Sequence, residues 1–74
     1  METKAVINGE RIECGVCGAL LAKRKYTNDV ITDKLHEGDF VKAYEENGIT
    51  TSIEIKCNHK DKGKKCGAIN KILL

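Results

Sequence analysis

The sequence predicts a small, mainly β domain that depends on a bound metal ion for its stability. The first observation is length, because 74 residues bury only enough apolar surface for about 3–5 kcal/mol of net stability. The second is a set of four cysteines in two groups, and the third is a series of β-branched segments beside them. We therefore expect one domain over residues 1–74, with an insertion at about 27–51.

The first elements form a predicted hairpin that leads into the first cysteine pair. Residues 5–12 are two short apolar segments around Asn8-Gly9, a dipeptide typical of hairpin turns. Cys14-Gly15-Val16-Cys17 follows directly, and Gly18 supplies the positive φ that such a chelating turn, or knuckle, requires. We expect residues 19–26 to continue as a strand.

The insertion is the least regular part of the sequence. Asn28 is a candidate cap for a helix ending near Gly38, and Asp39 for a second helix ending near Gly48. The β-branched and aromatic residues of the segment favour strands instead, and Asn47-Gly48 is a second hairpin signal. Strand is the favoured prediction for 40–46, whereas 28–38 stays open and a short helix within 28–48 remains an alternative.

The last elements are two predicted strands that flank the second cysteine pair. Ile49, Thr51, Ile53 and Ile55 alternate with polar residues, which predicts a half-buried strand ending at Cys57. Eight polar residues then separate Cys57 from Cys66, and we expect them to form a bulging loop that brings both sulfurs to one point. Residues 68–73 form the third strand of a predicted three-stranded antiparallel sheet, the layout of a zinc ribbon.

Four cysteines in this arrangement favour metal over disulfides. No charged-then-apolar leader begins the sequence, so we expect a cytoplasmic protein, in which disulfides do not persist. Four thiolates are the usual ligands of structural zinc, which predicts one zinc ion bound by Cys14, Cys17, Cys57 and Cys66. Iron in the same site, and His59 in place of Cys57, remain alternatives.

The composition excludes several classes of protein. The longest apolar run, residues 19–22, is far too short to cross a bilayer, so no membrane association is expected. Four thiolates would also fill the coordination sphere of zinc and leave no open position for a substrate. We therefore expect neither an enzyme nor a site for a small-molecule substrate.

Basic residues occur in two groups that point to a nucleic-acid partner. The formal net charge is only +2, and residues 28–55 contain seven acidic residues against two lysines. Outside this acidic insertion, lysine and arginine side chains are placed to contact the phosphates of RNA or DNA. The candidate contacts are Lys23, Arg24, Lys25, Lys60, Lys62, Lys64 and Lys65.

Three blocks of the sequence resemble a known family. Residues 12–23, with Cys14, Cys17 and the following Gly18-Ala19-Leu20-Leu21, residues 53–57 and residues 66–70 are together similar to the Com family of Mu-like phages. These are small, zinc-finger-like translational regulators. The resemblance implies a four-cysteine zinc site and binding to messenger RNA. The family's second pair is normally another Cys-x-x-Cys, whereas here a lysine-rich segment intervenes.

A second function class competes with nucleic-acid binding. Zinc ribbons also act as rigid platforms for protein partners, and the fold alone does not decide between the two. The acidic insertion would then be the surface that docks a basic protein. Salt-sensitive binding to RNA distinguishes the two hypotheses, because only the first predicts it.

Overall fold

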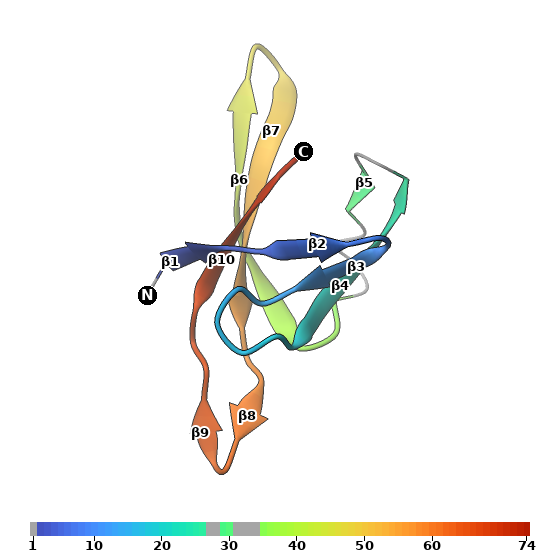
Figure 1. Cartoon of the computed structure of the whole chain (residues 1–74). Helices are drawn as coiled ribbons and strands as arrows, with labels where there is room; N and C mark the ends of the chain where they lie inside the picture. Colours follow the sequence, from blue (N-terminus) through green and yellow to red (C-terminus); the bar gives the residue numbers. More distant parts are fainter. Residues whose placement is uncertain (1, 27–28, 31–34) are drawn as a thin grey trace.

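Ten β-strands make up the regular structure of the computed structural model, which describes residues 2–26, 29–30 and 35–74 (Figure 1). None of these described residues lies in a helix, and so the described part contains no helix able to span a membrane. The mainly β class predicted from the sequence is therefore confirmed. The strands are β1 Glu2–Lys4, β2 Val6–Asn8, β3 Arg11–Glu13, β4 Leu20–Tyr26, β5 Asp29–Val30, β6 Gly38–Glu46, β7 Ile49–Cys57, β8 Lys60–Asp61, β9 Lys64–Lys65 and β10 Ile69–Leu73.

The larger sheet joins the two ends of the chain. Its order is β1-β10-β7-β6, and all neighbours are antiparallel except β1 and β10, which run parallel. The N–H of Ala5 donates to the carbonyl of Lys71 (3.0 Å) and prolongs that parallel pairing. The expectation of one three-stranded antiparallel sheet is wrong in two respects. The first residues of the chain add a parallel strand at the edge, and the strand expected over 19–26, β4 (Leu20–Tyr26), pairs with β3 in a second sheet.

The second sheet has the order β2-β3-β4-β5 and holds the predicted N-terminal hairpin. Only Ala5 separates β1 from β2, and Figure 1 shows the two strands as one extended segment that passes from sheet to sheet. The hairpin is confirmed, but its turn is shifted by one residue. Asn8 pairs with Arg11, so that Gly9 and Glu10 form the loop, with φ of 62° at Gly9.

In two further hairpins, β6–β7 and β8–β9, the turn consists of two adjacent residues with positive φ. In the β6–β7 hairpin these are Asn47 (53°) and Gly48 (77°), between the paired residues Glu46 and Ile49. This is the pattern of a type I′ turn, which suits the twist of antiparallel strands. The strand prediction for 40–46 is confirmed, and the alternative helix starting at Asp39 is wrong. Of the helix considered for 28–37, Asp29–Val30 instead form β5 and residues 35–37 are not helical, whereas residues 28 and 31–34 lie outside the described residues.

The hydrophobic core lies between the two sheets. Ile12, Leu21 and Ala22 of the smaller sheet pack against Ile53, Ile55 and Ile72 of the larger one. Cys14, Cys57 and Ala68 complete this buried cluster, so two of the predicted metal ligands are themselves core residues.

The outer halves of β6 and β7, residues 41–51, extend beyond the core and are called the β6–β7 arm below. Figure 1 shows the arm projecting away from the smaller sheet, and the molecule measures 42 × 22 × 19 Å. The predicted buried face of β7 is therefore only partly right. Ile53 and Ile55 are buried, whereas Ile49 and Thr51 are exposed because no other strand of the described part of the chain packs over the arm.

Candidate metal centre

The first knuckle, residues 14–18, joins β3 to β4 through a tight turn. The N–H of Cys14 donates to the carbonyl of Ala19 (2.8 Å), and the N–H of Gly18 donates to the carbonyl of Cys14 (3.0 Å). Gly18 has φ of 77°, a conformation in which a Cβ atom is unfavourable. The turn therefore directs the side chains of Cys14 and Cys17 to the same side of the chain, as the Cys-x-x-Cys-Gly motif predicts.

The second knuckle, residues 57–67, repeats these hydrogen bonds at the corresponding positions. The N–H of Cys57 donates to the carbonyl of Ala68 (2.8 Å), and the N–H of Gly67 donates to the carbonyl of Cys57 (3.0 Å). Gly67 has φ of 70°, close to that of Gly18. The two knuckles therefore share one backbone pattern despite the different spacing of their cysteines.

The extra residues of the second knuckle form an ordered hairpin instead of the expected bulging loop. β8 and β9 pair through Lys60 with Lys65 and Asp61 with Lys64, and they turn at Lys62 and Gly63, both with positive φ. The N–H of Cys66 donates to the carbonyl of His59 (2.9 Å), which closes the base of this hairpin. Without residues 60–65 the second pair would be spaced like the first, as Cys-Asn-His-Cys.

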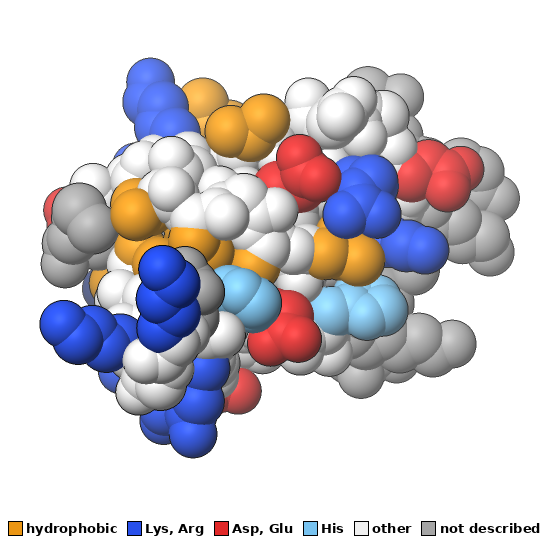
Figure 2. All heavy atoms as spheres, turned by 60° about the horizontal axis from the view of Figure 1, so that its bottom comes forward, with side chains coloured by type: hydrophobic (Ala, Val, Ile, Leu, Met, Phe, Trp, Pro, Cys, Tyr) orange, Lys and Arg blue, Asp and Glu red, His pale blue; other side chains and the backbone are white. Residues whose placement is uncertain are grey.

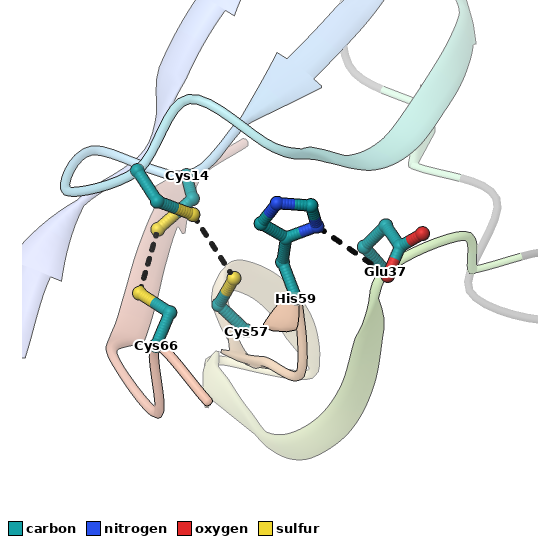
Figure 3. Close-up of polar contacts among 6 residues, drawn as sticks. Cys14, Glu37, Cys57, His59 and Cys66 are labelled. Atoms are coloured by element: carbon teal, nitrogen blue, oxygen red, sulfur yellow. Dashed lines mark hydrogen bonds and ion pairs between the residues drawn. The ribbon is translucent and has the colours of Figure 1, made fainter. Parts of the chain in front are cut away.

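The two knuckles bring all four predicted ligand atoms together. The Sγ atoms of Cys14, Cys17, Cys57 and Cys66 lie within 4.8 Å of one another. The Sγ atoms of Cys14 and Cys66 are 3.7 Å apart, and those of Cys17 and Cys57 are 3.5 Å apart (Figure 3). A disulfide would require about 2.05 Å, and the four cysteines are free.

The sulfur separations suit a single tetrahedral ion. Zinc–sulfur bonds of about 2.3 Å place the corners of a tetrahedron about 3.8 Å apart, close to the two short separations. Four sulfur donors are also the set that soft or borderline metals prefer. The cluster can therefore hold a metal ion, and four protein ligands would leave no coordination position for a substrate.

Asn70 links the two knuckles and was not identified as a site residue from the sequence. Its side chain is fully buried, and its Nδ2 group donates to Cys14 Sγ (3.4 Å) and to the carbonyl of Ala68 (3.3 Å). Its Oδ1 atom accepts from the N–H of Gly15 (2.9 Å). A single amide on β10 therefore orients a ligand of the first knuckle from the strand that follows the second.

The thiols differ in acidity because their surroundings differ. Burial raises the pKa of Cys14, but hydrogen bonds from backbone N–H groups of Cys17 and Val16 and from Asn70 outweigh it and lower the pKa to about 6. Burial is the main cause of a raised pKa at Cys57, and it also raises the pKa of Cys17. A metal ion that binds here displaces the protons these thiols still carry.

His59 lies beside the sulfur cluster but points to a different partner. Its Nδ1 atom is 3.9 Å from Glu37 Oε2, and Figure 3 shows the ring directed to that carboxylate. Within the described residues the cluster consists of the four cysteines alone. The structure thus brings the sulfur of Cys57, and not the imidazole of His59, to the other three cysteine sulfurs.

The predicted basic residues fall into two separate groups. Lys62, Lys64 and Lys65 line a groove of about 410 Å³ together with Val16, Cys17, His59 and Cys66. Lys60 pairs with Lys65 on the same hairpin. Figure 2, which brings the bottom of Figure 1 forward, shows several Lys and Arg side chains at the lower left of the molecule and others, beside acidic side chains, at the right.

The other three basic residues lie on β4, which leads away from the first knuckle (Figure 1). Lys23 is exposed, and Arg24 Nε donates to the carbonyl of Gly9 (3.2 Å). The side chain of Lys25 lies outside the described residues. Among the candidates whose side chains the structure describes, the hairpin lysines are those brought to the sulfur cluster.

In comparisons with known proteins, no family model, curated sequence or solved structure matches this chain.

Proposed function

We propose that this protein is a small zinc-binding regulatory protein that binds nucleic acid. One zinc ion would be held by Cys14, Cys17, Cys57 and Cys66 in a ribbon-like arrangement of two knuckles. The observation that carries the proposal is that the lysine-rich β8–β9 hairpin is inserted between two cysteines of the same four-sulfur cluster. The resemblance to the Com family supports messenger RNA as the partner and translation as the regulated process.

Metal binding would fix the position of these lysines. The hairpin is anchored at both ends, because His59 and Cys66 are hydrogen-bonded at its base and Cys57 and Cys66 flank it in the sequence. A four-thiolate zinc site carries a charge of about −2, which the lysines around the groove offset. The remaining positive charge of the hairpin would then be presented to a polyanion by a rigid support.

The salt dependence of RNA binding tests this proposal. A random-sequence, single-stranded RNA pool serves as the probe in a filter-binding titration at two salt concentrations. Each lysine that contacts a phosphate contributes about 0.7 to the slope of log K against log salt. The triple variant Lys62→Gln, Lys64→Gln, Lys65→Gln should therefore lower the slope by about 2.

A matched variant keeps the same change in net charge but leaves the hairpin intact. It carries Lys4→Gln, Lys42→Gln and Lys56→Gln, three exposed residues outside the groove. Its slope should stay close to that of the wild type. Absence of salt-sensitive RNA binding by the wild type at micromolar concentration would contradict the proposal, and equal losses in both variants would exclude the hairpin as the contact surface.

Protein binding is the second candidate function, and the edge of β6 favours it. This strand ends the larger sheet, and every residue from Asp39 to Glu46 is exposed. Phe40, Val41 and Tyr44 present apolar surface there. No other described strand pairs with the outer edge of β6, and such an edge is a template for pairing with an extended segment of a partner. This function becomes the favoured one if the RNA titration shows no binding.

A further inference from the structure

The four sulfurs are unequally accessible. Cys14 and Cys57 belong to the core and are 2% and 0% exposed. Cys17 is exposed and Cys66 is half-buried, and both line the groove between the first knuckle and the β8–β9 hairpin. A small oxidant that enters this groove therefore reaches the sulfur of Cys17 before those of the core cysteines.

The sulfur that could form a disulfide with an oxidised Cys17 belongs to the second knuckle. Cys17 Sγ lies 3.5 Å from Cys57 Sγ, and Cys14 Sγ lies 3.7 Å from Cys66 Sγ. Each contact joins a cysteine between β3 and β4 to one at or beyond the end of β7. A disulfide would need each pair to approach by about 1.5–1.7 Å, which rotation of two cysteine side chains supplies more easily than backbone movement.

We propose that Cys17 is a site of oxidation by hydrogen peroxide and that the first product is a disulfide between Cys17 and Cys57. This bond joins one knuckle to the other, so that a covalent link holds the two knuckles together in place of the metal. The proposal rests on the four-sulfur metal site and is independent of nucleic-acid binding.

The chemistry balances with peroxide as the oxidant. The Cys17 thiolate attacks one peroxide oxygen, the O–O bond breaks, and the hydroxide that leaves takes up a proton to form water. The Cys57 thiolate then attacks Sγ of the resulting sulfenic acid, the S–O bond breaks, and a second hydroxide is protonated to water. Two thiolates thereby lose two electrons to one peroxide.

Loss of two thiolate ligands should release the metal without dissociating the knuckles. Cys14 and Cys66 remain, and two sulfurs do not complete a structural zinc site. A second peroxide oxidises this pair in the same way. Because the bonded residues are 40 and 52 positions apart in the sequence, both disulfides close long loops and restrict the unfolded chain strongly.

Peptide mapping of the metal-loaded protein tests the proposal. One equivalent of peroxide is added, free thiols are alkylated, and the chain is digested with trypsin. Cys14 and Cys17 share the peptide 12–23, whereas Cys57 lies in 57–60 and Cys66 in 66–71. The expected product is 12–23 joined to 57–60, with the bond on Cys17 by fragmentation and with release of one metal ion per disulfide.

Two other products would overturn the proposal. An unlinked peptide 12–23 that has lost two hydrogens would show a bond within the first knuckle. Conversion of Cys17 to sulfinic or sulfonic acid without a disulfide would show that Cys57 does not reach it. The amide spectrum of the oxidised protein should stay dispersed, and its collapse would show that the cross-knuckle bond does not support the fold.

Two matched variants separate the role of Cys17 from that of any exposed ligand. Histidine is an accepted fourth ligand beside three cysteines, so Cys17→His and Cys66→His should both retain one metal ion. The Cys66→His protein should still form the Cys17–Cys57 disulfide, and the Cys17→His protein should not. A Cys17→His protein that loses its Cys57 thiol to a disulfide as fast as the wild type would contradict the proposal.

Discussion

The metal centre and the β6–β7 arm are both built from hairpins, but different forces hold them in place. The side chain of Asn70 on β10 ties the first knuckle to the strand that follows the second, and Cys14 and Cys57 belong to the buried core. The arm has a favourable Asn47-Gly48 turn, yet Val41, Tyr44 and Ile49 on it remain exposed. Local turn chemistry therefore sets the turn of the arm, whereas the body depends on contacts between residues far apart in the sequence.

This difference shows why the metal should matter so much in a chain of this size. Two of the candidate ligands, Cys14 and Cys57, are also core residues. Loss of a bound metal would therefore leave unpaired thiols or thiolates in the core, which lowers the stability of the fold. The arm contributes little to that core. An isolated two-stranded hairpin is marginally stable in water, and the arm should persist only while the body beneath it is folded.

The largest effect is expected from removal of a ligand. Cys14→Ser or Cys66→Ser should leave the domain largely unfolded, because structural zinc contributes roughly 10–16 kcal/mol of apparent binding free energy and the apolar core far less. Loss of dispersion in the amide spectrum measures the change. A serine variant with dispersed signals and no bound metal would show that the core folds alone.

The next largest effect distinguishes two isoleucines of the same strand. Ile55 is 0% exposed beneath the smaller sheet, whereas Ile49 is 68% exposed on the arm. Ile55→Ala should lower the free energy of unfolding by about 2–5 kcal/mol, and Ile49→Ala by less than about 0.5 kcal/mol. Denaturant titration of the metal-loaded proteins gives both values, and similar losses would mean that the arm is part of the core.

A smaller effect is expected from Asn70, which has no counterpart on the arm. Asn70→Ala removes the donor to Cys14 Sγ and leaves the N–H of Gly15 without its acceptor. Removal of such a supporting group typically weakens metal binding by about 10–100-fold. Competition with a chromophoric chelator measures the affinity, with Asn58→Ala as the control. Equal affinity of the Asn70 variant and the wild type would exclude this role.

The smallest effect is expected at His59. His59→Ala should keep one metal ion per chain, because the imidazole faces Glu37 and lies outside the sulfur cluster. Metal analysis of the purified variant checks this. Loss of stoichiometric metal would identify His59 as a ligand and would move Cys57 out of the site.

The features that could be predicted from the sequence are those with a local signal. Cys-x-x-Cys-Gly defines a knuckle within five residues, and Asn47-Gly48 marks a turn by itself. Alternation of Ile53 and Ile55 with polar residues marks the buried face of β7. Each of these depends on neighbours in the chain, so the convergence of the four cysteine sulfurs and most strands were predicted correctly.

The features that could not be predicted depend on partners far away in the sequence. Glu2–Lys4 has no apolar alternation, and it becomes a strand only because β10 offers its edge. Asn70 resembles any polar residue of a strand until the first knuckle packs over it. The β8–β9 hairpin has a polar sequence, and the only local signal for its turn was Gly63 after Lys62.

Native mass spectrometry before and after treatment with a chelator tests the central claim most directly. We predict a mass that corresponds to one zinc ion per chain, and a shift to higher charge states together with loss of amide dispersion when the ion is removed. A folded protein that carries no metal under the same conditions, with the same spectrum in the presence of chelator, would contradict the account.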